Sequence, residues 1–172
     1  AKAINFGLIY GISAYGLAKQ LKIDNVEAKG IIDTYFAKYK RVKEFMEELK
    51  ELASKQEYVE TMHGRKVFLP NISHSNFQVR SAAERTAINA PIQGTAADII
   101  KIAMINIKEW LIKEDIQNVF MIMQVHDELV FEIEDSDIHR YGDKISQLMG
   151  SAEKLSVPLL VNTFSGSNWQ ET

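Results

Sequence analysis

The stretch VFMIMQVHDELVFEIE, residues 119–134, contains the clearest β-strand pattern of this 172-residue chain. Two β-rich runs, 119–125 and 128–134, flank the dipeptide His126–Asp127, which predicts an antiparallel hairpin with that dipeptide at its turn. In the second run, mostly acidic residues alternate with large apolar ones. One face of this strand is therefore expected to be buried and the other exposed.

Helical periodicity is expected over most of the remaining chain. Asp24 followed by Glu27 resembles a capping box, Pro91 is expected to end a helix, and Thr95 with Asp98 predicts the start of the next one. The expected helices cover residues 1–11, 24–36, 42–52, 76–90, 95–111 and 136–149, with a small hairpin within 58–70 and a final strand at 157–163. Helices first, and strands mixed with helices later, predict an α+β fold.

Composition excludes several classes of protein. The chain has 46% hydrophobic and 25% charged residues, which is typical of a globular protein, and no cysteine for disulfides, thiolate zinc sites or cysteine nucleophiles. No apolar run approaches the roughly 18–20 residues of a membrane span. The four histidines lack metal-ligand spacing, and neither a glycine-rich phosphate loop nor a G-x-S-x-G motif is present.

The formal charge of −3 conceals an uneven distribution. Residues 1–90 contain 14 Lys and Arg against 10 Asp and Glu, whereas residues 91–172 contain 6 against 13. The total alone gives no sign of nucleic-acid binding, but the basic half and the acidic half differ enough to require an explanation.

Lys2, Phe6 and Tyr10 form the first candidate site. Their spacing of four residues places them along one helical face, where an ammonium, an aromatic ring and a phenol suit a phosphate, a base and a sugar. The alternative is an aromatic pair that faces the core. Gly7 and Gly11 each cost about 1 kcal/mol in a helix relative to Ala, so we expect close approach of a ligand, or a hinge, at these positions.

Arg85, Asn89 and Gln93 form the second candidate site. Arg85 and Asn89 share a helical face and Gln93 follows shortly after, so the three offer a guanidinium and two amides to acceptor atoms of a nucleic-acid minor groove. Ordinary surface polarity and capping are the alternative. Basic residues nearby are expected to contact phosphates: Arg65, Lys66 and Arg80.

The predicted turn between the two strands is the third candidate site. A tight turn presents Asp127 at the tip of a rigid hairpin, where a carboxylate suits a Mg²⁺ ion that also binds substrate phosphates. Glu128 adjoins it. The alternative is that Asp127 is only a favourable turn residue and that Glu128 faces water.

Three segments together resemble one known family. KAINFGLIYG at 2–11, AINAPIQGTAADIIK at 87–101 and QVHDELVFE at 124–132 resemble, in order and interval, the C-terminal part of family A DNA polymerases of the bacterial DNA polymerase I type. Residues 58–72 and 157–161 are similar too, so the resemblance covers essentially the whole chain.

The resemblance implies an architecture. Residues 1–90 are expected to be a mostly helical fingers portion with a small hairpin. Residues 91–172 are expected to be a partial palm: a long helix, the catalytic hairpin 119–134, a helix and a final strand. The fold class is thus α+β, with a partial antiparallel palm sheet and flanking helices. The first residue is Ala, and no capping residue precedes the first helix, so we expect the chain to be part of a longer one.

The resemblance also implies roles for the basic half of the chain. Lys2 is expected to contact the triphosphate of the incoming deoxynucleotide, Phe6 its base and sugar, and Tyr10 the templating base. The other three candidates are expected to contact the minor groove of the primer–template near its end: Arg85, Asn89 and Gln93.

In the acidic half, the resemblance places Gln124 and His126 at the primer terminus. Asp127 is expected to bind catalytic Mg²⁺, and Glu128 to be a neighbouring acid with a less essential role. A second palm carboxylate of the family is expected upstream of the fingers helix, outside this chain.

The implied function is template-directed addition of deoxynucleotides to a primer 3′ end by two-metal nucleotidyl transfer, in DNA replication and repair. The implied partners are primer–template DNA, deoxynucleoside triphosphates and the remainder of the polymerase chain, with no membrane, in a bacterial cytoplasm. Because a palm carboxylate is missing, we expect the chain alone to be inactive. A non-catalytic, polymerase-like nucleic-acid-binding module is the alternative.

Overall fold

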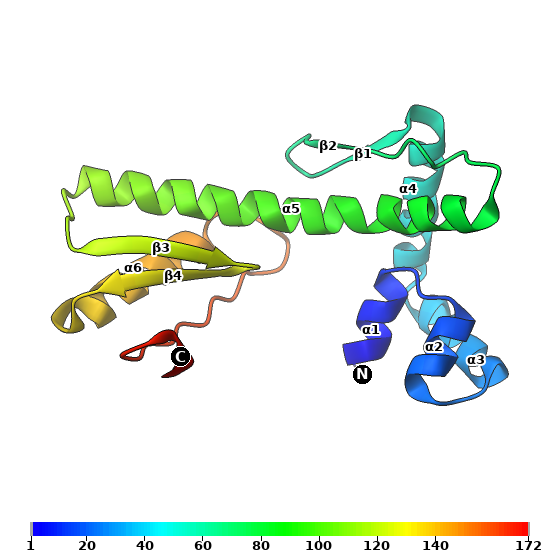
Figure 1. Cartoon of the computed structure of the whole chain (residues 1–172), viewed down its shortest axis with the longest axis horizontal. Coiled ribbons are helices and arrows are strands. Elements are labelled where there is room, and N and C mark those ends of the chain that lie inside the picture. The colour runs from blue at the N-terminus through cyan, green and yellow to red at the C-terminus, as the bar shows by residue number, and fades with distance from the viewer. Residues whose placement is uncertain (1, 172) are drawn as a thin grey trace. The chain divides into compact units, whose positions relative to one another are not determined.

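The chain folds into two compact units that meet between Thr95 and Ala96. The structure, a computed structural model, describes residues 2–171. One helix, α5 (Phe77–Lys113), runs through the boundary and contributes residues to both units (Figure 1). We describe each unit by itself, as the N-terminal and the C-terminal unit.

The N-terminal unit is mostly helical, with one small antiparallel hairpin. Its elements before α5 are α1 (Lys2–Ile9), α2 (Ala14–Leu21), α3 (Asn25–Lys38), α4 (Lys40–Gln56), β1 (Tyr58–Glu60) and β2 (Lys66–Phe68). One apolar cluster joins α1, α2 and α3 around Leu8 and Leu17. A second joins α4, the β1–β2 hairpin and the first half of α5 around Val59 and Ala87. Two separate small cores therefore hold this unit together.

The predicted helix starts and turns in this unit are largely confirmed. Asp24 caps α3, and its Oδ1 accepts a hydrogen bond of 2.7 Å from the Glu27 N–H. The predicted break falls at Tyr39, between α3 and α4. The β1–β2 hairpin also forms as expected, with Gly64 at a positive φ of 76° in its turn. These features depend on short-range interactions, which a sequence displays directly.

The outer face of α4 is a solvated charged surface, as its mixed charges predict. Arg41 pairs with Glu44 at 2.8 Å and with Glu48 at 3.3 Å, and Lys50 pairs with Glu47 at 2.9 Å. Hydrogen bonds with Glu44 first, and then with Glu48, raise the pKa of Arg41 above its ordinary value. Such exposed pairs contribute little to stability.

The expected helix break at Pro91 is wrong, because α5 is one continuous helix of 37 residues. Pro91 has no N–H for the Ala87 carbonyl, which normally stops a helix. Here Pro91 is itself buried, and apolar packing continues on both sides of it. Thr95 does not cap a new helix either, since its hydroxyl accepts a hydrogen bond from the Met62 N–H at 3.0 Å. Tertiary contacts thus override two local signals.

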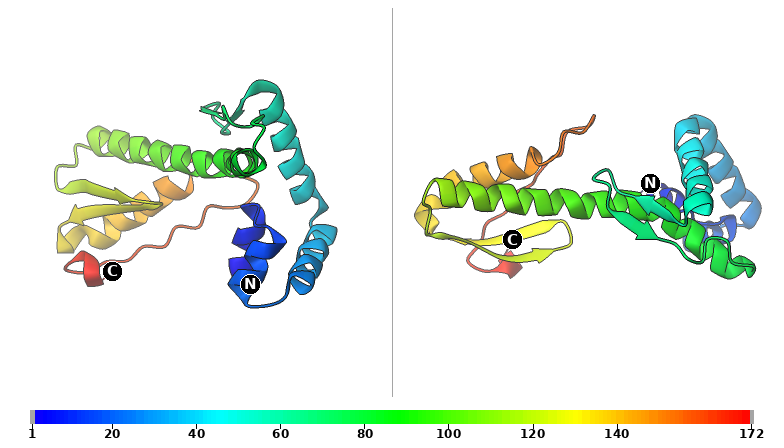
Figure 2. Two further views of the ribbon diagram at one scale, coloured as in Figure 1. Left: turned by 45° about the vertical axis from the view of Figure 1, so that its right-hand side comes forward. Right: turned by 90° about the horizontal axis from the view of Figure 1, so that it is seen from above.

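The C-terminal unit contains the second half of α5, an antiparallel hairpin and a packed helix. Its other elements are β3 (Val119–Val125), β4 (Glu128–Ile133), the 3₁₀ turn η1 (Asp135–Asp137), α6 (Ile138–Gly150) and the 3₁₀ turn η2 (Trp169–Glu171). Both views of Figure 2 show β3, β4 and α6 alongside this half of α5. The core contains Ile107 and Leu111 of α5, Val119 of β3, and Tyr141 and Ile145 of α6.

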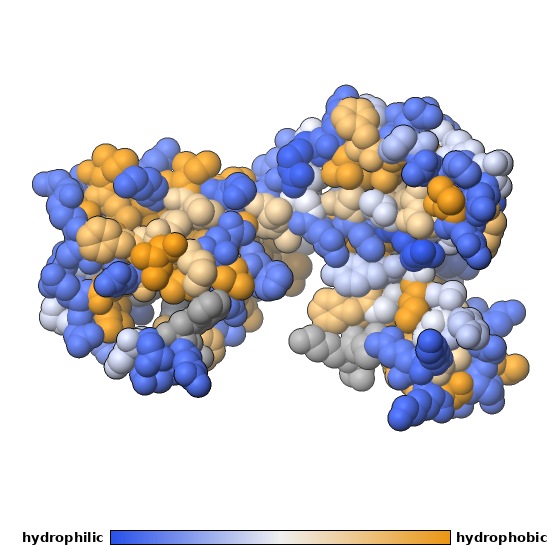
Figure 3. Space-filling view, viewed as in Figure 1, coloured by the Kyte–Doolittle hydropathy of each residue, from blue (hydrophilic) through white to orange (hydrophobic). Residues whose placement is uncertain are grey.

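The sequence predicts that buried apolar residues alternate with exposed polar ones in the second strand of the hairpin. The structure shows this alternation on β4, the second strand, but not on β3. On β4, Glu128 and Glu132 are exposed, whereas alternate apolar residues pack against the core. On β3, however, three of the four exposed positions are apolar, namely Phe120, Ile122 and Met123, and the register is irregular near Ile122. Figure 3 shows apolar side chains at the surface of this unit. The hairpin therefore carries an uncovered apolar strip.

The expected final strand at 157–163 is wrong: the structure shows no regular secondary structure there. A strand needs a neighbour for its N–H and C=O groups, and the residues that the structure describes provide none beside this segment. The segment instead packs near the end of α6, where a β-carbon built at Gly150 would lie 3.2 Å from the Leu159 carbonyl oxygen. In the described residues, no helix is both long and apolar enough to cross a membrane.

The Asp24 cap gives a test of the N-terminal unit. Asp24→Ala removes the acceptor of the Glu27 N–H, so the free energy of unfolding should fall by about 1 kcal/mol. Urea unfolding followed by circular dichroism measures this change. Asp33→Ala, an exposed carboxylate within the same helix, is the matched control and should change stability by less than about 0.5 kcal/mol. Equal effects of the two substitutions would contradict the capping role.

Candidate nucleotide and nucleic-acid interface

The first candidate face lies on α1 and is at the surface. The rings of Phe6 and Tyr10 have centroids 6.0 Å apart and planes inclined at 33°. Phe6 is 48% exposed and Tyr10 is half-buried, so the alternative of a pair facing the core does not describe Phe6. Lys2 is the first residue of α1, but its side chain lies outside the described part of the chain. An aromatic face is thus available to a ligand.

The two glycines of this segment have a different role from the one expected. A β-carbon at Gly7 would lie 3.2 Å from the side chain of Ile12, and Gly11 follows the end of α1 with a positive φ of 72°. At Gly11 a β-carbon would lie 3.4 Å from Cγ of Arg85 and 3.7 Å from Cδ1 of Ile88. The chain's own packing explains both glycines, and this packing brings the end of α1 against the second candidate site.

Arg85, Asn89 and Gln93 lie on α5 and form a polar row. Successive members are four residues apart on an unbroken helix, so each is turned by only about 40° from the previous one. Arg85 is exposed and donates to the Ser81 hydroxyl at 3.0 Å, and Gln93 is exposed. Asn89 is half-buried, and its buried Oδ1 has no hydrogen-bond partner within residues 2–171. The row therefore presents amide and guanidinium groups along one side of α5.

The basic residues expected to contact phosphates are oriented by the chain itself. A guanidinium N–H of Arg65 donates to the Gly94 carbonyl at 3.0 Å, and the Lys66 ammonium lies 4.2 Å from the Tyr58 ring centroid. Arg80 donates to the His74 carbonyl at 3.0 Å. Their phosphate contacts stay a prediction, but the structure links Arg65 directly to the helix that carries the polar row.

Sequence reasoning missed the contact between the β1–β2 turn and α5. It involves Thr61, Gly94 and Thr95, of which the two threonines are buried. The sequence shows no clear signal for it, because Gly94 lies in the predicted break between helices 76–90 and 95–111, where glycine is common.

The third candidate site lies at the β3–β4 turn, as predicted. His126 and Asp127 connect Val125 to its partner Glu128, and Asp127 and Glu128 are both exposed. His126 has a positive φ of 53°, which is uncommon for a residue with a side chain. The Gln124 side-chain amide donates to the His126 carbonyl at 3.1 Å. The turn thus fixes the backbone that presents Asp127.

The turn fits part of a Mg²⁺ site. Mg²⁺ commonly binds through one or two carboxylates together with substrate phosphates, which Asp127 and Glu128 match in number and chemistry. Within the described residues, however, no group of three or more potential metal ligands comes together. A complete two-metal site would need at least one further carboxylate close by.

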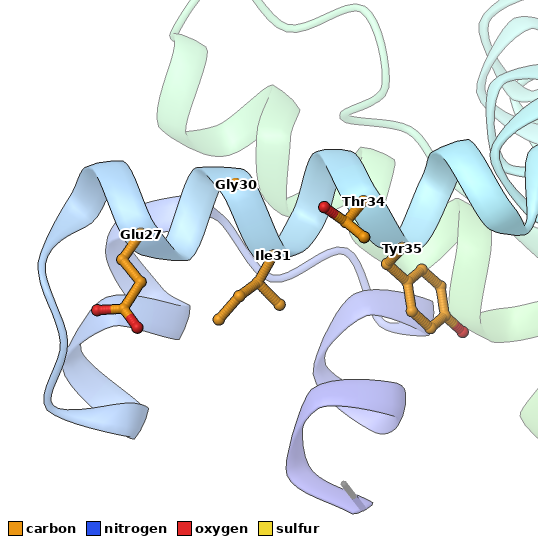
Figure 4. Close-up of a pocket in the computed structure, with 5 residues that line it drawn as sticks. All are labelled: Glu27, Gly30, Ile31, Thr34 and Tyr35. Carbon is orange, nitrogen blue, oxygen red and sulfur yellow. The ribbon is translucent and has the colours of Figure 1, made fainter.

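A shallow groove of about 570 Å³ in the N-terminal unit is lined by α3 residues only, and no predicted site residue lines it. Figure 4 shows Glu27, Ile31 and Tyr35 directed from α3 toward α1 and α2. Ile31 and Tyr35 also pack against the core of these helices. The groove is therefore separate from the three candidate sites.

Comparison with known proteins identifies the family. The model of the family described as DNA polymerase family A matches residues 1–171. This chain belongs to DNA polymerase family A. Among curated relatives in this family, DNA polymerase I of Pseudomonas aeruginosa is 51% identical over 171 residues, and that of Streptococcus pneumoniae is 46% identical over 171 residues.

Each of these family A relatives is much longer than the chain. The matches cover 99% of the chain but only 19% of each relative, so the chain spans about a fifth of their length. Among solved structures, the POL domain of Pol1 from M. smegmatis, in complex with DNA primer-template and dNTP, is similar with a TM-score of 0.87 and 46% identity. That match covers 92% of the chain and 28% of the solved chain. The α+β fold predicted from the sequence is thereby confirmed.

The left-handed conformation of His126 can be tested. His126→Val places a β-branched residue at positive φ and should destabilise the hairpin by about 1–2 kcal/mol, whereas His126→Gly should be tolerated because glycine adopts this conformation freely. Amide hydrogen exchange along β3 and β4 reports this local stability. Protection in the valine variant equal to that in the glycine variant would show that the turn does not require the conformation.

Proposed function

We propose that this chain forms the nucleotide-binding, primer–template-binding and part of the metal-binding machinery of a template-directed DNA polymerase. The observation that carries the proposal is the set of three motifs, in family order, within a chain that family A matches over residues 1–171. Residues 1–90 would act as fingers and residues 91–172 as part of the palm. The boundary between the two compact units, after Thr95, lies close to this division.

The proposed reaction is attack of the primer 3′-hydroxyl on the α-phosphorus of a deoxynucleoside triphosphate. A new phosphodiester bond forms, the bond to the β-phosphate oxygen breaks, and pyrophosphate leaves. Asp127, with Glu128 beside it, would hold Mg²⁺, which supplies Lewis-acid stabilisation of the attacking and leaving oxygens in two-metal transfer. A carboxylate from the remainder of the polymerase chain would complete the metal site.

On α1, the exposed aromatic face would receive the incoming nucleotide. Phe6 and Tyr10 lie side by side there, so a base and a sugar could pack against Phe6 while Tyr10 contacts the templating base. Lys2 would offset negative charge on the triphosphate. The contact between Gly11 and Arg85 joins this face to the polar row on α5.

The polar row on α5 would contact the minor groove of the primer–template. Minor-groove acceptors are nearly the same in every correct base pair, so Asn89 and Gln93 could sense pair geometry without reading sequence. Asn89 would meet these acceptors through its side-chain NH2, whereas its buried Oδ1, which has no hydrogen-bond partner within residues 2–171, would need a donor such as the guanine amino group. Gln124 and His126 would lie at the primer terminus.

A non-catalytic nucleic-acid-binding module is the second candidate. The absence of a complete metal cluster within residues 2–171 favours it for the chain in isolation. The exposed carboxylates at the rigid turn favour the polymerase for the longer chain of which this segment would be part, in a bacterial cytoplasm. The two readings differ in whether Asp127 is required for synthesis.

The isolated chain should bind primer–template weakly and should not extend it. Extension should fail because the described residues do not bring together enough carboxylates for a complete metal site. Primer extension with labelled DNA, Mg²⁺ and deoxynucleotides measures this directly, with fluorescence anisotropy for binding. Mg²⁺-dependent extension by the purified 172-residue chain would contradict the expectation.

The role of Asp127 can be tested in a chimeric polymerase, in which this segment replaces the matching 171 residues of the Pseudomonas aeruginosa relative. Asp127→Ala should lower the rate of synthesis by about a thousandfold or more, because it removes a group that stabilises the charge of phosphoryl transfer. Binding of primer–template should change little. Asp143→Ala, which removes an exposed carboxylate of α6, is the control and should retain synthesis. Retained synthesis in the Asp127 variant would favour the non-catalytic module.

A further inference from the structure

Two buried hydroxyls stabilise the contact between the β1–β2 turn and α5: one bonds across the contact, and the other bonds within the turn. Thr61, at 5% exposure, and Thr95, at 8%, are the two buried polar side chains of the part of the chain that the structure describes. The Thr95 hydroxyl accepts from the Met62 N–H at 3.0 Å. The Thr61 hydroxyl accepts from two N–H groups of its own turn, at 3.3 Å from His63 and 3.2 Å from Arg65. Together these bonds give hydrogen-bond partners to three backbone N–H groups of the turn.

Gly94 makes this close contact possible. A β-carbon built there would lie 2.6 Å from Cγ2 of Thr61, which is closer than such atoms approach one another in proteins. The Thr61 methyl cannot rotate away, because the same rotation would move the hydroxyl that accepts the two turn amides. Arg65 adds a bond from its guanidinium to the Gly94 carbonyl at 3.0 Å. Any side chain at position 94 must therefore displace the turn from the helix.

This contact adjoins the polar row. Gln93 directly precedes Gly94, and Asn89 lies four residues before Gln93 on the same helix. The turn that is fixed here also carries Arg65. A shift of the turn relative to α5 would therefore change the spacing between a cation suited to phosphates and an amide suited to the minor groove.

We propose that Gly94, Thr61 and Thr95 are positioning residues for primer–template binding. They fix the position of the β1–β2 turn relative to Gln93 on α5, so that Arg65 of the turn and Gln93 can contact the DNA at the same time. This inference rests on the proposed function, because it takes Gln93 to be a DNA contact. It assigns none of the three residues a direct contact with DNA.

The first experiment introduces the steric conflict and then removes it. In the chimeric polymerase, Gly94→Ala should weaken primer–template affinity about tenfold, as expected for residues coupled through direct contact. The KM for deoxynucleotide should stay unchanged, since the nucleotide face lies on α1. Adding Thr61→Ser deletes the conflicting methyl but keeps the hydroxyl, so the double variant should recover most of the affinity. Failure of this rescue would overturn the steric explanation.

A matched control separates positioning from helix propensity. Gly30→Ala also replaces a helical glycine of the N-terminal unit, but a β-carbon there meets no atom within 4 Å. It should leave DNA affinity unchanged. Fluorescence anisotropy with labelled primer–template measures affinity, and thermal unfolding of each variant is recorded alongside. A loss of affinity in Gly30→Ala equal to that in Gly94→Ala would overturn the proposal.

A double-mutant cycle with Gln93→Ala decides whether Gly94 acts through Gln93. If it does, Gly94→Ala should weaken binding about tenfold when Gln93 is present and less than about twofold when Gln93 is already Ala. Equal losses in both backgrounds would overturn the positioning role and leave a purely structural one. If Gln93→Ala alone leaves affinity unchanged, the DNA contact in the proposed function fails, and the inference fails with it. If Gln93→Ala weakens binding but Gly94→Ala does not, only the inference fails.

Discussion

The unbroken course of α5 is the constraint on which the other elements depend. This single helix supplies Ala83 and Ala87 to one apolar core and Ile107 and Leu111 to another. At 1.5 Å per residue, its 37 residues span about 55 Å, so a helix that ended at Pro91 would still supply the first core but not Ile107 and Leu111 of the second. The burial on both sides outweighs the hydrogen bond that the proline removes. The continuity of α5 past Pro91 also places Gln93 in line with Arg85 and Asn89, because residues four apart lie on the same side only within one continuous helix.

The features that the sequence predicts well are those whose stabilising partners lie a few residues away. The Asp24 cap depends on an N–H three residues later, and the two hairpins depend on turns flanked by matching strands. The features it predicts badly depend on distant partners. Thr95 has the local pattern of a cap, yet its hydroxyl bonds to Met62, 33 residues earlier. Residues 157–163 have the composition of a strand, but composition cannot provide the neighbour that a strand requires.

The candidate sites also differ in whether their features depend on near or on distant residues of the chain. Spacing alone was enough to place Phe6 beside Tyr10, and Asp127 at an exposed turn. Spacing was not enough to interpret the glycines. A glycine can indicate that another group lies close to the backbone, but the sequence does not identify that group. At Gly11 the neighbour is the side chain of Arg85, and at Gly94 it is Thr61. Both neighbours lie tens of residues away along the chain, so only the folded structure distinguishes these positions from a ligand contact or a hinge.

The uneven charge of the chain follows the boundary of its two units. Residues 91–95 carry no charge, so the division predicted after residue 90 and the structural one after Thr95 separate the same charged residues. The N-terminal unit therefore has an excess of four positive charges and the C-terminal unit an excess of seven negative ones. A basic surface attracts a phosphate backbone directly, whereas an acidic one can meet phosphates only with a cation between them. A net charge near zero is thus the sum of two opposite requirements, and it says little about whether such a protein binds nucleic acid.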